Sequence, residues 1–222
     1  MNAPDKYIIN ELRKEEAWRM FRIMGEFTEG FDTLAGLTPA VTVYGSARIR
    51  HDDPLFKTAE DLGRRLAQAG YAVVTGGGPG IMEAANKGAF EAGGVSIGLT
   101  IALPKEQPCN NFHTLTIDFH HFFVRKVMLV RYATAFVLMP GGFGTLDELF
   151  ETITLIHTNK IRPFPVFLMG GDYWAGLLAW MKEQTLGRAY IDPTDLDALQ
   201  VVDDPEQIID AIDRWQQLKG AD

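Results

Sequence analysis

Two glycine-rich segments each follow a short apolar run and precede an amphipathic stretch, an arrangement that can surround an anion with backbone N–H groups. The first reads TGGGPGIME over residues 75–83, and the second reads PGGFGTLDE over residues 140–148. Because glycine lacks a Cβ atom, the chain can turn tightly there and approach a ligand closely. One such segment could equally be an ordinary tight turn, but two of them favour an anion-binding site.

The second segment offers the more complete phosphate cradle. The backbone N–H groups of Gly142, Gly144 and Thr145, the Thr145 hydroxyl and the dipole of the following helix could all act on one anion. Neither segment has the Lys-Ser/Thr pair of a P-loop, and Ile81 stands where a dinucleotide-binding GxGxxG pattern needs its last glycine. We therefore expect a small phosphorylated ligand and no bound cofactor.

Glu148 is the candidate catalytic carboxylate. It follows Thr145 by three residues, so the helical period places both side chains on one face, whereas Asp147 is rotated by about 100°. A carboxylate one turn behind a phosphate cradle would reach the sugar and stabilise positive charge developing there. The same Thr-x-x-Glu spacing also satisfies the capping box of a helix N-terminus, which is the structural alternative.

Arg125 and Lys126 precede the second segment within a predicted helix. Either side chain could contact phosphate, sugar hydroxyls or the leaving base, and the planar fork of arginine suits bidentate contacts. The alternative for both is a solvated surface charge. We expect no metal at the neighbouring His120 and His121, because adjacent helical side chains point in different directions and no clear carboxylate–histidine set accompanies them.

These loops need a parallel sheet whose strand ends lie together. Short β-branched or aromatic runs alternate with amphipathic stretches, the pattern of βαβ units. We predict an α/β fold, a Rossmann-like open parallel sheet with helices on both faces, in which ligands bind outside the carboxyl ends of the strands. The predicted strands are 41–44, 71–75, 95–100, 113–117, 135–139, 165–169 and 199–202, and the predicted helices are 54–69, 81–92, 120–132, 145–158, 173–184 and 205–218.

An aromatic-rich amphipathic stretch precedes the sheet, at about residues 11–34. Its apolar residues recur mostly at three- and four-residue intervals: Trp18, Phe21, Ile23, Met24, Phe27 and Phe31. We predict a helical extension over about residues 10–36, attached to a single Rossmann-like nucleotide-binding domain that spans residues 1–222. The apolar surface of this extension and of the helix at 120–132 predicts a homodimer or a higher homo-oligomer.

Composition excludes several other classes of protein. The chain has 222 residues and a formal net charge of −8, which opposes binding to nucleic acid. Cys109 is the only cysteine, so no internal disulfide can form, which fits a reducing compartment. Since no apolar stretch is typical of a signal peptide or a membrane span, we expect a cytoplasmic protein without a membrane partner.

The segments GGGPGIMEAANKGA at 76–89 and PGGFGTLDE at 140–148 resemble the LONELY GUY family of phosphoribohydrolases, many of which older naming called possible lysine decarboxylases. The resemblance runs from about residue 41 to 167 and includes Gly45-Ser46-Ala47-Arg48 and Arg125-Lys126. It implies hydrolysis of the N-glycosidic bond of nucleoside 5'-monophosphates, such as AMP or a cytokinin riboside 5'-monophosphate, to free base and ribose 5-phosphate.

Carried over by motif, the resemblance implies that Arg125 and Glu148 form the catalytic pair. The substrate-binding residues would be Ser46, Gly77, Gly78, Met82, Lys126, Gly141, Gly142, Gly144 and Thr145. Lysine decarboxylation has no residue-level support, because no Schiff-base lysine with partners for a pyridoxal ring can be identified. Similar folds serve as carriers of the molybdenum cofactor, and this non-catalytic alternative is disfavoured by the intact Arg125 and Glu148.

Overall fold

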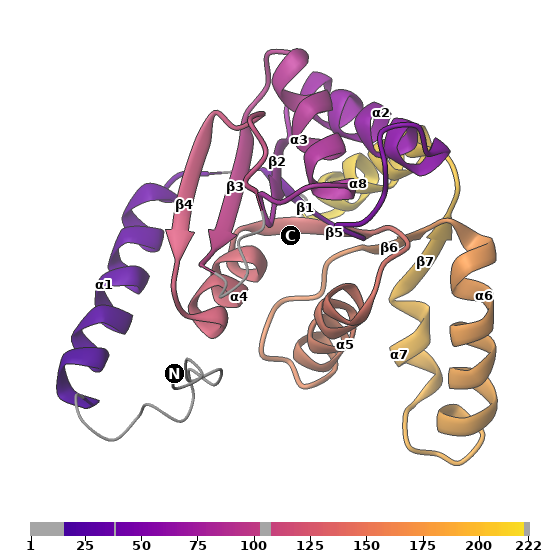
Figure 1. Cartoon of the computed structure of the whole chain (residues 1–222). Coiled ribbons are helices and arrows are strands. Elements are labelled where there is room, and N and C mark those ends of the chain that lie inside the picture. Colours follow the sequence, from indigo (N-terminus) through magenta and orange to yellow (C-terminus); the bar gives the residue numbers. More distant parts are fainter. Residues whose placement is uncertain (1–15, 38, 103–107, 220–222) are drawn as a thin grey trace, which may run out of the picture.

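The computed structural model describes residues 16–37, 39–102 and 108–219. Seven strands form one sheet in which every neighbouring pair is parallel (Figure 1). They are β1 (Ala40–Tyr44), β2 (Ala72–Thr75), β3 (Ser96–Ile101), β4 (Leu115–Phe119), β5 (Ala133–Leu138), β6 (Val166–Met169) and β7 (Leu199–Val202). Their order in the sheet is β4-β3-β2-β1-β5-β6-β7, so the predicted Rossmann-like open parallel sheet is confirmed.

Helices cover both faces of this sheet. They are α1 (Glu16–Thr33), α2 (Pro54–Gln68), α3 (Ile81–Glu91), α4 (Phe122–Arg131), α5 (Phe143–His157), α6 (Gly171–Trp180), α7 (Pro193–Asp197) and α8 (Pro205–Lys219), with a π-helical turn (Met181–Leu186) after α6. Buried residues of α2, α3 and α8 form one core with the sheet. Those of α4, α5 and α6 form the core on the opposite face, where α1 lies against α4.

The side chains of β1 point alternately to the two faces of the sheet, so this strand contributes residues to both cores. Val41 and Val43 belong to the core with α2 and α3, whereas Tyr44 belongs to the core with α4 and α5. Successive side chains of a strand point to opposite faces, so Tyr44 must face the side of the sheet that carries α4 and α5. This places a polar hydroxyl group beneath those two helices.

The sheet has a topological switch point between β1 and β5. The chain runs outward from β1 to β4 and then returns to β5 on the other side of β1. The loops that follow β1 and β5 therefore diverge, and the crevice between them is where open α/β sheets bind ligands. The Ser46 N–H donates a hydrogen bond of 3.0 Å to the Pro140 carbonyl, which ties the two loops together at their start.

Several predicted boundaries differ from the structure. The strand predicted at 113–117 lies at 115–119, because Thr114 instead makes loop hydrogen bonds with Ser96. The helix predicted from 120 begins at Phe122, because Glu26 of α1 accepts the backbone N–H groups of His120 and His121. The short helix α7 was not predicted, and residues 10–15 of the predicted N-terminal helical extension lie outside the described residues. In the described ranges, every helix falls short of the length or apolar character that a bilayer span requires.

Candidate active site

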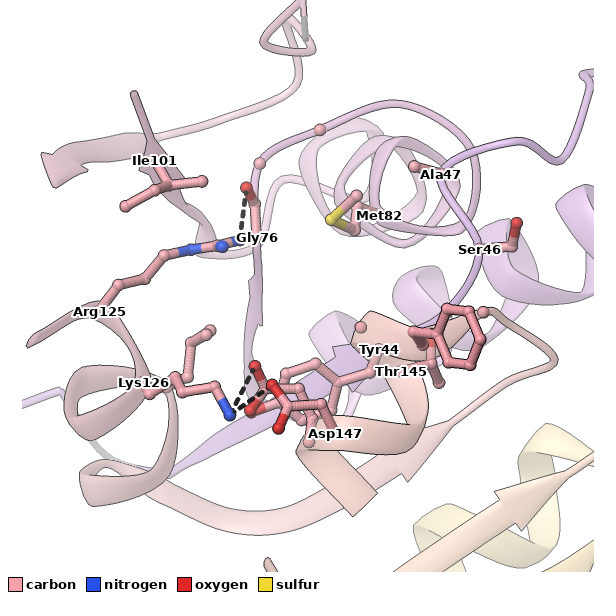
Figure 2. A pocket seen from close by; sticks show the side chains of 18 of the residues that line it. Tyr44, Ser46, Ala47, Gly76, Met82, Ile101, Arg125, Lys126, Thr145 and Asp147 are labelled. Atoms are coloured by element: carbon pink, nitrogen blue, oxygen red, sulfur yellow. Dashed lines mark hydrogen bonds and ion pairs between the residues drawn. The ribbon is translucent and has the colours of Figure 1, made fainter. Parts of the chain in front are cut away.

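A cavity of about 660 Å³ opens at the carboxyl ends of β1, β2, β3 and β5 (Figure 2). It brings together the predicted residues Ser46, Gly77, Gly78, Met82, Arg125, Lys126, Gly142, Gly144, Thr145 and Glu148. Gly141 is the one predicted site residue that is not among the residues lining it. The two glycine loops and the start of α4 therefore face one common space.

The α5 helix begins at the cavity with its N-terminus uncapped by any side chain. Gly142 is the N-cap residue and makes no side-chain cap hydrogen bond. The first N–H groups of a helix have no partner within the helix, so those of this turn are available to an anion in the cavity. Phe143, the first residue of α5, is 92% exposed and leaves this end of the helix open.

Gly141 supports this turn from behind. A Cβ atom at residue 141 would overlap the Thr145 hydroxyl, and the Gly141 carbonyl accepts a hydrogen bond from Tyr173 of α6. Only glycine lets the chain pass so close to Thr145 without moving the first turn of the helix. Gly141 therefore shapes the turn, while Gly142, Gly144 and Thr145 line the cavity.

The capping-box interpretation of Thr145 and Glu148 is wrong. Because α5 begins at Phe143, Thr145 is its third residue rather than its N-cap, and Glu148 lies in the second turn. A capping box needs the first residue of the pair to precede the helix. The Glu148 side chain is therefore free to take part in the contacts around the cavity.

The first glycine loop is held in a conformation that requires glycine. Gly77 has a φ of 70°, and a Cβ atom there would lie 2.6 Å from the Thr100 Cγ2 atom. Asn110 donates its backbone N–H to the Gly77 carbonyl and its side-chain amide to the Gly78 carbonyl, both at 2.9 Å. With these carbonyls occupied by Asn110, the loop presents its remaining surface to the cavity.

Arg125 reaches from α4 to the ends of β2 and β3 rather than into solvent. Its Nε donates to the Leu99 carbonyl at 2.6 Å and its Nη2 donates to the Gly76 carbonyl at 3.2 Å. Figure 2 shows this guanidinium beside Gly76 at one side of the cavity. Burial lowers the pKa of Arg125, while the nearby Glu148 charge acts to raise it. The surface-charge alternative is therefore wrong for Arg125.

Lys126 is surrounded by carboxylates of α5. Its Nζ lies 2.7 Å from Asp147 Oδ2, 2.7 Å from Glu151 Oε2 and 3.7 Å from Glu148 Oε1. Burial opposes its charge, but the hydrogen bonds to Asp147 and Glu151 prevail and raise the pKa of the ammonium group. Its side chain is only 18% exposed, so a solvated surface charge is also the wrong description here. Lys126 holds α4 against α5 and fixes the carboxylates beside the cavity.

Glu148 is a buried carboxyl group at the wall of the cavity. Its side chain is 13% exposed, and burial raises its pKa to about 7 despite the opposing charge of Lys126. Asp147 and Glu151 raise this pKa further, and Arg125 lowers it. Near neutral pH such a group can both stabilise a cation and accept a proton, as a general base must.

The structure adds lining residues that the sequence reasoning missed. The most informative are Tyr44 at the end of β1 and Arg48 in the loop after it. A signal for both was present, because the last residue of a strand and the loop after it lie at the edge where parallel sheets bind ligands. Other lining residues beyond the predicted set are Gly45, Ala47, Gly76, Thr100, Ile101, Cys109, Phe122, Leu129, Phe143, Leu146 and Asp147.

Comparison with known protein structures agrees with the fold. The chain superposes on the X-ray structure of TM1055 with a TM-score of 0.62 and 26% identity, covering 80% of this chain and 99% of that chain. It also superposes on a molybdenum cofactor binding protein from Rippkaea orientalis with a TM-score of 0.59 and 23% identity, covering 79% and 94% of the two chains. At that identity, the second likeness shows a shared fold alone.

Comparison with known sequences defines the family. Residues 82–212 match a family model described as "Possible lysine decarboxylase". A cytokinin riboside 5'-monophosphate phosphoribohydrolase from Rhodococcoides fascians is 28% identical over 176 residues, or 78% of this chain and 88% of that protein. A protein of the same name from Mycobacterium tuberculosis is 29% identical over 174 residues, which cover 77% of this chain and 91% of that protein. This chain therefore belongs to the LONELY GUY family of phosphoribohydrolases, whose family model keeps the description of possible lysine decarboxylases.

Proposed function

We propose that this protein hydrolyses the N-glycosidic bond of nucleoside 5'-monophosphates, such as AMP or a cytokinin riboside 5'-monophosphate, to free base and ribose 5-phosphate. The observation that carries the proposal is the open N-terminus of α5 with buried Glu148 in the next turn of the same helix. Thr145 and Glu148 are about 4.5 Å apart along the helix axis. A phosphate bound at the helix N-terminus thus leaves the ribose beside the carboxyl group.

In this mechanism the base leaves with the electrons of the glycosidic bond and takes up a proton from solvent, and Glu148 later releases to solvent the proton that it accepts from the attacking water. The ribosyl ring gains positive charge, and water attacks its anomeric carbon and loses a proton. Ionised Glu148 stabilises the cationic ring and accepts the proton of the attacking water. Arg125 lies across the cavity, where a fixed guanidinium group can hold the substrate and stabilise the departing base.

The non-catalytic carrier of the molybdenum cofactor is not favoured. The carrier structures resemble this chain in fold at 23% identity, whereas the named sequence relatives are hydrolases. A carrier has no cationic transition state for Glu148 to stabilise, so in a carrier the buried carboxylate would only repel the anionic ligand. A hydrolase with a cationic transition state gains stabilisation from the same group.

The 5'-phosphate of the substrate should decide how efficiently the protein cleaves it. We expect AMP to be cleaved at least about a hundredfold more efficiently than adenosine, since the phosphate would anchor the ribose at α5. Free adenine released from each compound at equal enzyme concentration measures this ratio. Equal turnover of the two compounds would exclude the phosphate anchor. Release of no base from any monophosphate, with tight binding of the molybdenum cofactor, would establish the carrier.

Arg48 provides a matched test of where the phosphate lies. It lines the cavity in the loop after β1, whereas Arg50 lies outside it and pairs with Asp52 at 3.2 Å. We expect Arg48→Ala to raise KM for AMP about tenfold with a smaller change in kcat, because an arginine–phosphate contact acts mainly in binding. The control Arg50→Ala should leave KM unchanged. If both variants behave alike, Arg48 has no part in the site.

We also propose that the protein is cytoplasmic and works as a symmetric homo-oligomer whose minimum unit is a dimer. The supporting observation is a set of apolar side chains that are at least 40% exposed on α1 and α4: Trp18, Met20, Phe21, Met24, Phe122, Phe123 and Val127. The two helices are in contact with each other, and exposed apolar side chains gathered on neighbouring helices are typical of an interface between subunits.

The assembly is tested by light scattering at micromolar concentration, for which we expect twice the mass of the chain or a multiple of it. Phe123→Lys on α4 should shift the protein toward monomer, because a buried lysine at an apolar interface is unfavourable. Phe90→Lys is the matched control, since Phe90 is similarly exposed but lies on α3 at the other face of the sheet. A wild-type protein that runs as a monomer contradicts the proposal.

A further inference from the structure

Two buried polar atoms beside the cavity have no hydrogen-bond partner within the described part of the chain. They are the Tyr44 hydroxyl and the Glu148 Oε2 atom. Buried polar groups are almost always hydrogen-bonded, because burying one unpaired loses its contacts with water. Each of these atoms therefore calls for a hydrogen-bond partner, and both belong to residues that line the same cavity.

The position of the Tyr44 ring directs its hydroxyl toward α4 and α5. Tyr44 is the last residue of β1, is 7% exposed and packs edge-on against Phe136 of β5, with ring centroids 5.2 Å apart. Burial raises the pKa of Tyr44 well above its ordinary value, and Glu148 is the strongest charge that adds to this rise. The hydroxyl thus keeps its proton and is available as a hydrogen-bond donor.

The two oxygens of Glu148 face different surroundings. Oε1 lies 3.7 Å from the Lys126 ammonium group, whereas Oε2 is buried. Oε2 therefore cannot be the oxygen that acts on a ligand in the cavity, and Oε1 remains for that role. A donor at Oε2 would stabilise the ionised carboxylate without blocking Oε1.

We propose that Tyr44 is a positioning residue for Glu148. When the carboxylate is ionised, the Tyr44 hydroxyl donates a hydrogen bond to Oε2 while the Lys126 ammonium group stays close to Oε1. Together they would hold the carboxylate in one orientation beside the ribose. The role of Glu148 in hydrolysis rests on the proposed function, but the proposed hydrogen bond from Tyr44 to Glu148 does not.

Four charged side chains act on the pKa of Glu148. Arg125 and Lys126 face it from α4, Asp147 and Glu151 face it from α5, and Tyr44 faces it from β1. Replacing Tyr44 by phenylalanine removes one neutral donor and leaves all four charges and the ring packing in place. The substitution therefore measures the effect of the Tyr44 hydroxyl on Glu148 separately from the effect of the four charges.

The experiment is a titration of the Glu148 carboxyl group by NMR, in protein labelled with ¹³C at the glutamate side chains. The Glu148 signal is identified as the one lost in Glu148→Gln. We expect Tyr44→Phe to raise the titration midpoint by about one pH unit, because the ionised form loses its donor. The matched control is Tyr71→Phe, which removes a buried tyrosine hydroxyl bonded to Asp213 at 2.6 Å on the other face. It should leave the midpoint unchanged. An unchanged midpoint in Tyr44→Phe, or an equal shift in both variants, overturns the proposal.

Kinetics separate this inference from the proposed function. If the protein hydrolyses AMP, the acidic limb of kcat against pH should move upward in Tyr44→Phe by the same amount as the NMR midpoint, with KM unchanged. A midpoint that moves while the acidic limb stays in place would show that Tyr44 does not act through Glu148 in the reaction. If no monophosphate is cleaved, the proposed function fails, yet the titration still decides whether Tyr44 holds Glu148.

Discussion

Replacing Glu148 by glutamine is expected to lower kcat for AMP hydrolysis by about a thousandfold, the effect of removing a preorganised group aimed at the transition-state charge. Glutamine keeps the size of the side chain but can neither carry the negative charge nor accept a proton. Glu151→Gln is the matched control, since Glu151 also binds Lys126 at 2.7 Å but does not line the cavity. We expect that control to lose less than about tenfold, because it changes the site only through Lys126.

The Glu148→Gln variant should become more stable relative to wild type as the pH rises. The folded-state pKa of Glu148 is about 7 against an ordinary value of 4.5, so between these values the folded protein binds more protons than the unfolded chain. The free energy of unfolding of the wild type therefore falls as pH increases through this range. Glu148→Gln lacks this loss, which corresponds to at most about 3 kcal/mol at pH 8. Urea unfolding at pH 5 and pH 8 measures the difference. If Glu148→Gln keeps its activity, or loses it only because the protein unfolds, Glu148 has a structural role and not a catalytic one.

Replacing Arg125 by alanine is expected to lower kcat/KM by about a hundredfold or more. The substitution removes a fixed positive group from the cavity and leaves the carbonyls of Leu99 and Gly76 without their donor. Losing that donor also costs about 1–3 kcal/mol for each buried carbonyl. Arg125→Lys keeps the positive charge, but lysine lacks the planar fork that reaches both carbonyls. The activity of this variant should therefore fall between those of the wild type and Arg125→Ala.

Separate measurement of kcat and KM decides the role of Arg125. A fall in kcat with folding intact supports a part in the chemical step, whereas a rise in KM alone would make Arg125 a binding residue. Arg131→Ala serves as the control, since Arg131 lies on the same helix but outside the cavity and packs over the Phe31 ring at 5.1 Å. Wild-type activity in Arg125→Ala would contradict the assignment.

Features that depend on neighbours in the chain were predictable. The strands and helices follow from residue periodicity, and both glycine loops follow from residue types at strand ends. Parallel strands bring their carboxyl ends to one edge, so the meeting of the two loops with Arg125 could be anticipated as well. The predicted start of α5 was late by two residues because the helix begins directly after a glycine N-cap, where no side-chain signal marks it.

Features that depend on burial were settled by the tertiary structure. The parallel sheet, the two glycine-rich turns and the helical phase that puts Glu148 behind Thr145 could be predicted from the sequence, because these are local patterns. Sequence patterns could not reveal that Lys126 meets the three carboxylates of α5, that Gly141 supports the turn from behind, or that Tyr44 lines the same cavity as Glu148. Those relations join β1, α4 and α5, which are far apart in the chain. The packing of these elements buries Glu148 away from solvent, and this burial raises the pKa of its carboxyl group.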